Sequence, residues 1–421
     1  MRQARVSPGF TVVVAESISE LQPFVQELQE LASTAIEPNV FYEPWMLLPA
    51  LRWLTSDVEL CLALVFVDSE RSVSGRVLTG FFPLEIRNRY NHFPVKTARL
   101  WKHKHCHLCV PLMRRDHAPD TLSAFFDWIA SDSSRCNLLE LGHISGEGPF
   151  HKLLVQTIDA CDRANRVDVR FTRPQLDRAV TAEAYLSANV SKKHQKDLEK
   201  KQKKLSQLGN VEYVTPNSAA EVEDWVNQFI ALEASGWKGK LGEALALHDR
   251  DAHFFRESMC EAWRVRRLDL LGLRLGTNLI ALKFNLPCPG GSFAYVITYD
   301  EAYSAYSPGL LLEIENIRRV HGSRSVVWMD SCADKNSTIF NRIWAEKRLI
   351  ETLLVSNNSR VGDFWIAAIP VGHWLRRVLK PMPRRADVIK LSPAVASTDP
   401  LHEASPVQQT SSTPTESLVE R

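Results

Sequence analysis

The chain has 421 residues, of which 45% are hydrophobic and 24% charged, an ordinary composition for a folded protein and enough for two domains. A formal net charge of +2 gives no overall attraction for nucleic acid or membrane, so such a partner would need a local patch. No apolar run reaches the roughly 20 residues of a membrane span, and the N-terminus lacks a signal-peptide pattern, which predicts a cytoplasmic protein. The eight cysteines are too sparse and irregular for a disulfide scaffold.

The first half of the chain alternates patterns of strand and helix. Apolar periodicity predicts these elements in chain order: a strand at 10–15, a helix at 19–31, strands at 60–67 and 76–84, a helix at 121–131 and a strand at 137–142. The second half repeats this order of strand, helix, hairpin, helix and strand, although the residues themselves show no repeat. Two domains of similar architecture are therefore expected.

Residues 101–109, Trp-Lys-His-Lys-His-Cys-His-Leu-Cys, hold the densest group of metal-capable side chains. On a strand, the three histidines would share one face, which makes a zinc site geometrically conceivable. No second ligand cluster with metal spacing accompanies them. We therefore treat the segment as a strand and expect no metal here.

The apolar spacing predicts one long helix over residues 184–208. Its other face carries seven lysines: Lys192, Lys193, Lys196, Lys200, Lys201, Lys203 and Lys204. Such a face could track the phosphates of RNA or of a lipid carrier, but Asp197 and Glu199 interleave, and no aromatic residue is present for base stacking. A solvated helix surface is the preferred interpretation, and nucleic acid is not an expected partner.

The stretch from Leu268 to Asp330 predicts a hairpin, a third strand, a capped helix and a fourth strand. The hairpin turns at Gly-Thr-Asn, residues 276–278, and the third strand covers 292–299. A short apolar strand at 325–330 follows the helix and should be fully buried. The helix is thus expected to be a crossover between neighbouring strands.

The start of this helix is the first candidate binding site. Ser307 suits the N-cap, and Pro308 suits the first helical position. The amides of Gly309, Leu310 and Leu311 are expected to lack intrahelical partners, and the helix dipole adds partial positive charge, so a phosphate or pyrophosphate can dock there. Taken alone, Ser-Pro-Gly is better explained as a plain helix start. The order of elements around it favours a site.

That order resembles the GNAT superfamily of N-acyltransferases, in which acyl-CoA lies between two splayed parallel strands and its pyrophosphate meets the N-terminus of the intervening helix. The segments Ser235-Gly-Trp-Lys-Gly239, Tyr306-Ser-Pro-Gly-Leu-Leu311 and Met329-Asp330 look like the GNAT-related proteins of CelD or BcsL type, which are associated with cellulose and envelope polysaccharide synthesis. Fem-type peptidoglycan aminoacyltransferases are more distant relatives. The resemblance covers most of residues 10–380 and is more specific in the second half.

The chain departs from the usual pyrophosphate loop of the superfamily. That loop has the pattern Q/R-x-x-G-x-G/A, whereas residues 303–309 read Tyr-Ser-Ala-Tyr-Ser-Pro-Gly. Donor binding is therefore implied by the resemblance and by the expected geometry, and no motif indicates acetyl-CoA itself.

Acyl transfer to an amine needs a group that deprotonates the acceptor and a general acid for the departing thiolate. Tyr299 and Tyr306 fall between the third strand and the helix, where such groups are useful, although either is equally explained as a loop surface residue. Asp330 ends a buried strand beside a crossover helix, where open α/β sheets place ligands, so it could orient or deprotonate the amine. Alternatively, Asp330 caps the following turn with Ser331, and the sequence does not decide between these.

Three further residues are candidates for substrate binding. Trp237 and Lys238 lie between two glycines, which suits a lid over a sugar or a phosphate; the alternative is a tryptophan that plugs the domain interface beside a solvated lysine. Arg342 follows the last core strand and could reach a diphosphate, or it could simply lie on the surface.

Residues 364–385 mix apolar and basic side chains with three prolines, and we expect a helix docked on the second domain, with peripheral contact with the inner membrane as the alternative. The predicted division is an N-terminal GNAT-like half at 1–175, a C-terminal GNAT acyltransferase half at 176–385 and a disordered tail at 386–421. The tail is rich in Ser, Thr, Pro and Glu, and its few large apolar groups cannot offset the entropy of ordering.

The sequence therefore predicts an α/β protein of two GNAT-like domains in tandem, with mixed sheets and flanking helices. The expected activity is transfer of an acyl group, most simply acetyl, from acyl-CoA as co-substrate to an amine of a sugar or a cell-envelope precursor. The first half would shape the acceptor cleft. Two alternatives stay open: a tRNA-dependent Fem-like aminoacyltransferase, and a non-catalytic GNAT-fold binding module in polysaccharide assembly.

Overall fold

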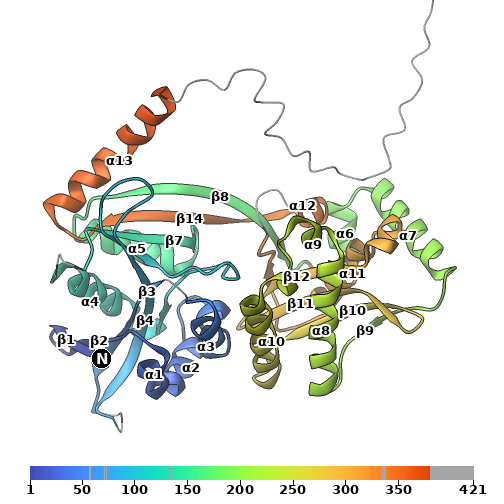
Figure 1. Ribbon diagram of the computed structural model, residues 1–421, viewed down its shortest axis with the longest axis horizontal. Helices are drawn as coiled ribbons and strands as arrows, with labels where there is room; N and C mark the ends of the chain where they lie inside the picture. Colours follow the sequence, from blue (N-terminus) through green and yellow to red (C-terminus); the bar gives the residue numbers. More distant parts are fainter. Residues whose placement is uncertain (56–57, 71, 73, 133–134, 334–337, 380–421) are drawn as a thin grey trace, which may run out of the picture. The chain divides into compact units, whose positions relative to one another are not determined.

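The computed structural model describes residues 1–55, 58–70, 72, 74–132, 135–333 and 338–379, and Figure 1 shows their arrangement. The strands are β1 (Arg2–Ser7), β2 (Phe10–Ala15), β3 (Glu59–Asp68), β4 (Arg76–Arg87), β5 (Thr97–Leu100), β6 (Leu112–Met113), β7 (Leu138–Ser145), β8 (Asn165–Asp177), β9 (Val211–Val214), β10 (Asp269–Leu275), β11 (Asn278–Cys288), β12 (Gly291–Tyr299), β13 (Trp328–Asp330) and β14 (Glu346–Ser356).

The helices alternate with these strands along the chain. The α-helices are α1 (Ile18–Leu21), α2 (Val25–Ser33), α3 (Pro44–Trp53), α4 (Ala118–Ala130), α5 (Pro149–Ala160), α6 (Ala182–Asn189), α7 (Lys192–Ser206), α8 (Ala219–Ser235), α9 (Trp237–Leu241), α10 (Asp249–Arg264), α11 (Pro308–Gly322), α12 (Thr338–Ile343) and α13 (Arg360–Leu379). Short 3₁₀ helices are η1 (Gln22–Phe24), η2 (Val40–Tyr42), η3 (Arg115–His117), η4 (Leu245–Leu247) and η5 (Glu301–Tyr306).

The strands form one sheet in the order β1-β2-β3-β4-β5-β7-β14-β8-β13-β12-β11-β10-β9, with β6 paired to β4. Each half contains a parallel strand pair joined through a crossover helix, β5–α4–β7 in the first and β12–α11–β13 in the second. The long strands β8 and β14 connect the halves, because β14 pairs with β7 and β8, and β8 also pairs with β13 (Figure 1). The predicted α/β class with mixed pairing, the 276–278 hairpin and the crossover helix are confirmed.

Apolar side chains cover both faces of the sheet in the second half. On one face, Phe284 of β11 packs against Phe229 of α8 and Phe255 of α10, with ring centroids 4.9 and 5.4 Å away. On the other face, Leu273 of β10 belongs to a buried cluster with Leu205 of α7 and with residues of α6, α11 and α12. Each strand of this half therefore contributes to two cores, as expected for an α/β sheet.

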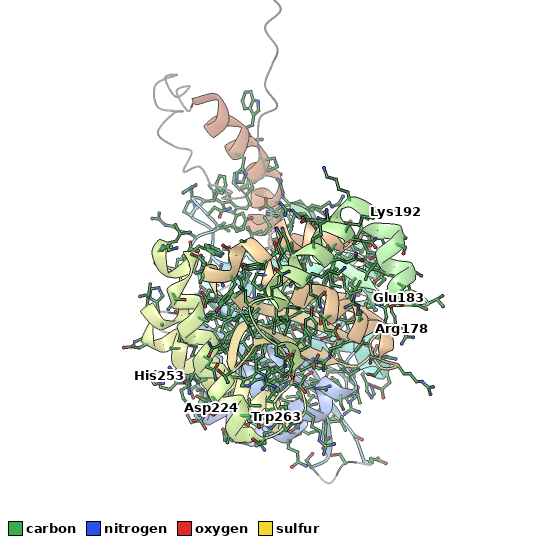
Figure 2. The ribbon with its side chains drawn as sticks, turned by 90° about the vertical axis from the view of Figure 1, so that its right-hand side faces the viewer. Arg178, Glu183, Lys192, Asp224, His253 and Trp263 are labelled. Carbon is green, nitrogen blue, oxygen red and sulfur yellow. The ribbon has the colours of Figure 1, made fainter. Side chains whose placement is uncertain are left out.

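The helix predicted over residues 184–208 is in fact two helices. Val190 adopts an extended conformation at the end of α6, and the side chain of Ser191 then caps α7. A serine that caps a new helix competes with continuation of the old one, which explains the break. Figure 2 shows Glu183 of α6 and Lys192 of α7 on the side of the molecule away from Asp224 of α8.

The segment 101–109, predicted as a strand, is instead a loop. The amide of Cys106 donates to His103 O at 3.0 Å and closes a turn, and Asn39 Nδ2 donates to Leu108 O at 3.1 Å. The amides of Trp101 and Cys109 donate to Pro83 O of β4 and His143 O of β7, so within the described structure the backbone of the segment bonds to strands only at its two ends. The sequence showed the alternation of residue types but not this turn.

Residues Met1–Ile369 form the compact unit described so far, and a second unit begins at Pro370. The described residues of the second unit belong to α13, which continues through Pro370. The predicted tail at 386–421 lies outside the described residues. Of the helices in the described part of the chain, none has the length and apolar content needed to cross a bilayer.

Candidate functional site

The two strands that flank α11 separate at their carboxyl ends. Strand β12 pairs with β13 only through Gly291–Phe293, opposite Trp328–Asp330, and β12 then runs on to Tyr299 without β13. Parallel strands that part beside a crossover helix form the type of crevice where open α/β sheets bind ligands. The junction predicted from the sequence is therefore present.

Strand β12 carries a β-bulge at this point. Phe284 of β11 pairs with Val296, whereas the next residue, Asn285, pairs with Ala294, so Tyr295 is the extra residue. The Tyr295 hydroxyl is buried and has no hydrogen-bond partner within the described residues, and the side chain is only 4% exposed. Bulges redirect side chains and are frequent beside active sites. An unpaired buried hydroxyl at such a place requires a physical explanation.

The N-terminus of α11 differs from the expectation in one respect. The amides of Leu310 and Leu311 both donate to Ser307 O, at 3.0 and 3.1 Å, so these two are already paired. Ser307 has a left-handed backbone (φ 52°), and its side chain makes no cap bond to the helix. Instead, Lys201 Nζ of α7 lies 3.0 Å from Ser307 Oγ and brings a cation to this helix start.

Two aromatic residues flank this helix start. A Cβ added to Gly309 would lie 3.3 Å from Cδ1 of Tyr299, at the end of β12. Tyr306 ends η5, immediately before Ser307. The structure thus brings Tyr299, Gly309 and Lys201 together at the mouth of the crevice, and Lys201 is the member that sequence analysis placed on a solvated face.

Asp330 is a fully buried carboxylate between two arginines. Its Oδ2 lies 2.7 Å from Arg173 Nη2 and 3.0 Å from Arg348 Nη1, and its Oδ1 accepts from the Cys332 amide at 3.0 Å. Burial would raise the pKa of Asp330, but the charges of Arg173 and Arg348 outweigh it and lower the pKa. Arg348 also binds Glu37 of the first half at 2.9 Å. Asp330 therefore joins a charge network that links the two halves.

The residues after α8 form the other wall of this region. Trp237 begins α9 and is 51% exposed, whereas Lys238 Nζ lies 2.5 Å from the buried Glu233. Lys240 binds Glu301 of η5, which ties this segment to the junction before α11. Trp237 thus offers a free aromatic face, while Lys238 is held in an ion pair.

Arg342 lies on α12 and faces α7. Burial lowers the pKa of His194 on α7, and the positive charge of Arg342 lowers it further. His194 and Lys201 are seven positions apart on α7, about 10 Å along the helix. Cations of α7 and α12 are thus distributed beside the start of α11.

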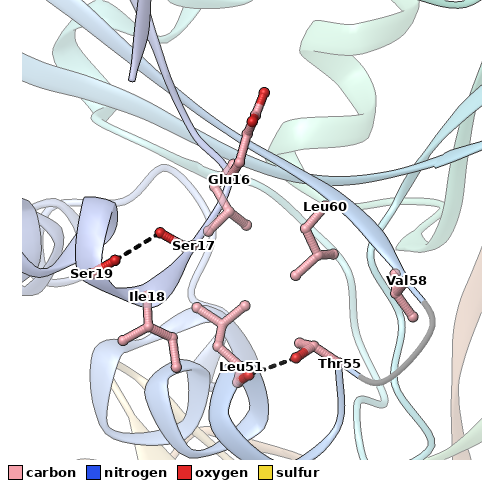
Figure 3. A pocket seen from close by; sticks show the side chains of 9 residues that line it. Glu16, Ser17, Ile18, Ser19, Leu51, Thr55, Val58 and Leu60 are labelled. Atoms are coloured by element: carbon pink, nitrogen blue, oxygen red, sulfur yellow. Dashed lines mark hydrogen bonds between the residues drawn. The ribbon is translucent and has the colours of Figure 1, made fainter.

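A cavity of about 460 Å³ lies elsewhere, in the first half (Figure 3). It is bordered by Ser17 and Ile18 at the start of α1, by Leu51 of α3, by Thr55 after that helix, and by Leu60 of β3. The Thr55 hydroxyl donates to Leu51 O at 2.8 Å, and the Ser17 and Ser19 hydroxyls bond each other at 2.9 Å, so these polar groups of the lining are already paired. The arrangement of reactive groups around α11 is a stronger indication of function than this hollow.

No group of three His, Cys, Asp or Glu side chains in the described part of the chain could hold a metal ion. Within the segment 101–109, Cys106 Sγ instead lies 3.7 Å from Cys109 Sγ, and both residues are buried.

Comparison with known proteins identifies the class. Residues 192–334, which include β9 to β13 and α11, match the family model for the acetyltransferase (GNAT) domain. No curated protein matches the chain. The second half therefore carries a GNAT domain, and the resemblance inferred from the junction at α11 is confirmed.

Solved structures show the fold of the whole chain. FemX is similar with a TM-score of 0.51 and 8% identity, over 84% of this chain and 97% of FemX. A conserved protein of unknown function from Bacteroides thetaiotaomicron has a TM-score of 0.48 and 10% identity, over 79% of this chain and 96% of that one. A tandem GNAT protein from the clavulanic acid biosynthesis pathway has a TM-score of 0.40 and 13% identity, over 83% and 99%. Residues 192–334 are thus similar to the GNAT domain, and the likeness of the chain to FemX extends to the fold alone.

Proposed function

We propose that this protein transfers an acyl group from acyl-CoA, acetyl-CoA in the simplest case, to an amine of a sugar or a cell-envelope precursor. The observation that carries the proposal is the separation of β12 from β13 beside the start of α11, within the segment that matches the GNAT domain. The remaining residues are assigned by their position around this crevice.

The donor pyrophosphate is proposed to bind at the start of α11, along the backbone of Ser307, Pro308 and Gly309, with Leu310 and Leu311 completing the first turn. Lys201 would contribute a charge-assisted hydrogen bond, because it already reaches Ser307 Oγ. The positive charge of Lys201 would attract the pyrophosphate. The amides of Leu310 and Leu311 cannot bind it, because they already donate to Ser307 O. Arg342, on α12 beside α7, would reach an outer phosphate.

The reacting thioester is proposed to lie near the bulge in β12. Tyr299 and Tyr306 lie at the two ends of the segment between β12 and α11, where a phenol can protonate the departing thiolate. Asp330, held by Arg173 and Arg348, is proposed to orient the crevice wall for the acceptor amine.

The acceptor is proposed to enter beside α9, where the first half (1–175) meets the second (176–385). The exposed ring of Trp237 can stack on a sugar, and Lys238 keeps the segment in place through Glu233.

We place the protein in the cytoplasm. The 62% exposed Phe364 of α13 supports a peripheral contact with the inner membrane.

Calorimetry tests the donor assignment. Binding of acetyl-CoA or of a longer acyl-CoA is expected, followed by amine-dependent release of CoA with glucosamine or lysine as the probe acceptor.

The Fem-like alternative, which takes its group from charged tRNA, is supported by the fold shared with FemX and by exposed lysines of α7 such as Lys193 and Lys200. Binding of tRNA without binding of CoA would favour that alternative. Binding of neither would favour a non-catalytic module.

A further inference from the structure

A histidine–aspartate pair connects the two halves beside the proposed crevice. His105, in the loop 101–109 of the first half, has Nε2 at 3.1 Å from Oδ1 of Asp251, in the first turn of α10. Its ring stacks on Phe254, with centroids 5.1 Å apart and an interplanar angle of 18°. Lys104 is the second partner of Asp251. These contacts fix both the position and the orientation of the imidazole.

The pairing also fixes which nitrogen of His105 is basic. An ionised carboxylate only accepts hydrogen bonds, so Nε2 carries the hydrogen in this contact and Nδ1 keeps its lone pair. None of the hydrogen bonds found among the described residues engages Nδ1. The His105 side chain remains 17% exposed. The basic nitrogen is therefore available to a group outside the protein.

The pair lies close to the bulge in β12. His107, two residues further along the loop, packs edge-on against Tyr295, with ring centroids 5.9 Å apart. Two residues of chain span at most about 7 Å, so the backbone of His105 is within that distance of the His107 backbone. The Tyr295 hydroxyl and both ring nitrogens of His103 are buried without partners in the described structure. Such atoms are rare in proteins and are commonly satisfied by a ligand or water.

We propose that His105 is the general base of the acyl transfer and that Asp251 is the positioning residue that sets its tautomer. This inference rests on the proposed function. The acceptor amine would approach between the loop 101–109 and the bulge at Tyr295, directly or through one water. Its nitrogen forms a bond to the acyl carbon, the carbon–sulfur bond breaks, and His105 Nδ1 takes the amine proton. Tyr299 or Tyr306 gives its proton to the departing thiolate and regains one from His105 through solvent. The products are the amide and the free thiol of CoA.

The electrostatics suit this role. Burial lowers the pKa of His105, and the charge of Lys104 lowers it further. The hydrogen bond and charge of Asp251 and the charge of Glu233 on α8 raise this pKa, but the net shift is downward. The imidazole is thus neutral at neutral pH, as a base must be. Burial alone would favour protonated Asp251, but hydrogen bonds from His105 and Lys104 lower its pKa, so it stays ionised and keeps accepting from Nε2.

The test compares His105→Gln, Asp251→Asn and, as a matched control, His92→Gln, which alters an exposed histidine of the same half. Acetyl-CoA affinity, melting temperature and CoA release with glucosamine or lysine are measured as a function of pH. His105→Gln is expected to keep affinity and melting temperature, to lower turnover about 10²- to 10⁴-fold and to remove the acid limb of the profile. Asp251→Asn should lose less turnover and move that limb to lower pH, because Asp251 raises the pKa of His105.

Turnover of His105→Gln within a few-fold of the wild type, or an equal loss in His92→Gln, overturns the assignment. A wild-type protein that binds no acyl-CoA refutes the proposed function instead, so the two failures are distinguishable. If acetyl-CoA binds but neither amine is acylated, ¹⁵N NMR of the imidazoles decides without activity. An Nε2–H tautomer of His105 that is lost in Asp251→Asn supports the inference, and an Nδ1–H tautomer in the wild type overturns it.

Discussion

At Asp330, one fully buried carboxylate pairs with the buried Arg173 and with the half-buried Arg348, which also binds Glu37. Arg173 is 157 positions away in the chain and arrives on β8, and Arg348 arrives on β14. The sequence correctly indicated an aspartate at the end of a buried strand, because that pattern is local. It could not indicate the arginines, since pairing between distant strands leaves no periodic signal.

Replacement of Asp330 by Asn should lower the free energy of unfolding by about 3 to 5 kcal/mol, because the buried Arg173 loses its counter-charge, while Arg348 keeps only Glu37. Turnover per folded molecule should fall by less than about tenfold, because Asp330 orients the crevice wall and takes no proton itself. Denaturant unfolding and CoA release are measured on one preparation, with the exposed Asp224→Asn as control. A hundred-fold loss of turnover with unchanged stability would instead identify Asp330 as a base.

The same residue predicts a dependence of stability on pH. Because the pKa of Asp330 is lowered in the folded protein, its contribution is present above the unfolded pKa of about 3.9 and is lost as the pH falls through the folded value. The difference in unfolding free energy between the wild type and Asp330→Asn should therefore shrink below about pH 4. A difference that stays constant into acid would show that the ionised state contributes nothing.

Among the elements, α11 is the one whose start we propose as the donor site. A larger side chain at Gly309 would contact Tyr299 and fill the backbone approach, so Gly309→Val should weaken acetyl-CoA binding about tenfold or more. Gly322→Ala, at the far end of the same helix, has no neighbour within 4 Å of the added carbon and serves as control. Calorimetry that finds unchanged affinity in folded Gly309→Val would refute the phosphate site.

The contact between α7 and α11 gives a separate expectation. Lys201→Met should lower acetyl-CoA affinity about tenfold, because one charge-assisted hydrogen bond to phosphate is lost. The exposed Lys203→Met, two residues along the same helix, should leave affinity unchanged. The effect of Lys201 should diminish at high salt, since ions screen the interaction. Equal effects of the two substitutions would mean that α7 acts only through its overall charge.

Most elements of the second half could be predicted from sequence, since the hairpin and α11 carry local periodicity and turn residues. Apolar spacing does not predict the break between α6 and α7, because that spacing continues through Ser191, the N-cap of α7. Ser307 was assigned as a capping residue, but its left-handed backbone and its bond to Lys201 depend on a neighbouring helix. The bulge at Tyr295 leaves no sequence signal either, because it is defined by register against β11.

On the scale of the whole molecule, β8 and β14 make one sheet of the two halves. We expect calorimetric unfolding of residues 1–379 to show a single transition, because neither half has a complete sheet of its own. A fragment of residues 1–175 should be unfolded or aggregated, since it lacks β14, the strand between β7 and β8. Two separate transitions, or a folded fragment, would contradict this expectation.

The position of β14 has a consequence for synthesis on the ribosome. The first half is translated early, yet the strand that must enter its sheet ends at Ser356, 179 residues after the end of β8 at Asp177. At about 5 to 20 residues per second, the nascent chain waits roughly 10 to 40 s between these two points. During that interval, the edge of β7 has no partner strand from β14, and such an edge pairs readily with other chains. Nascent chains of this protein should therefore depend on chaperones until translation is nearly complete.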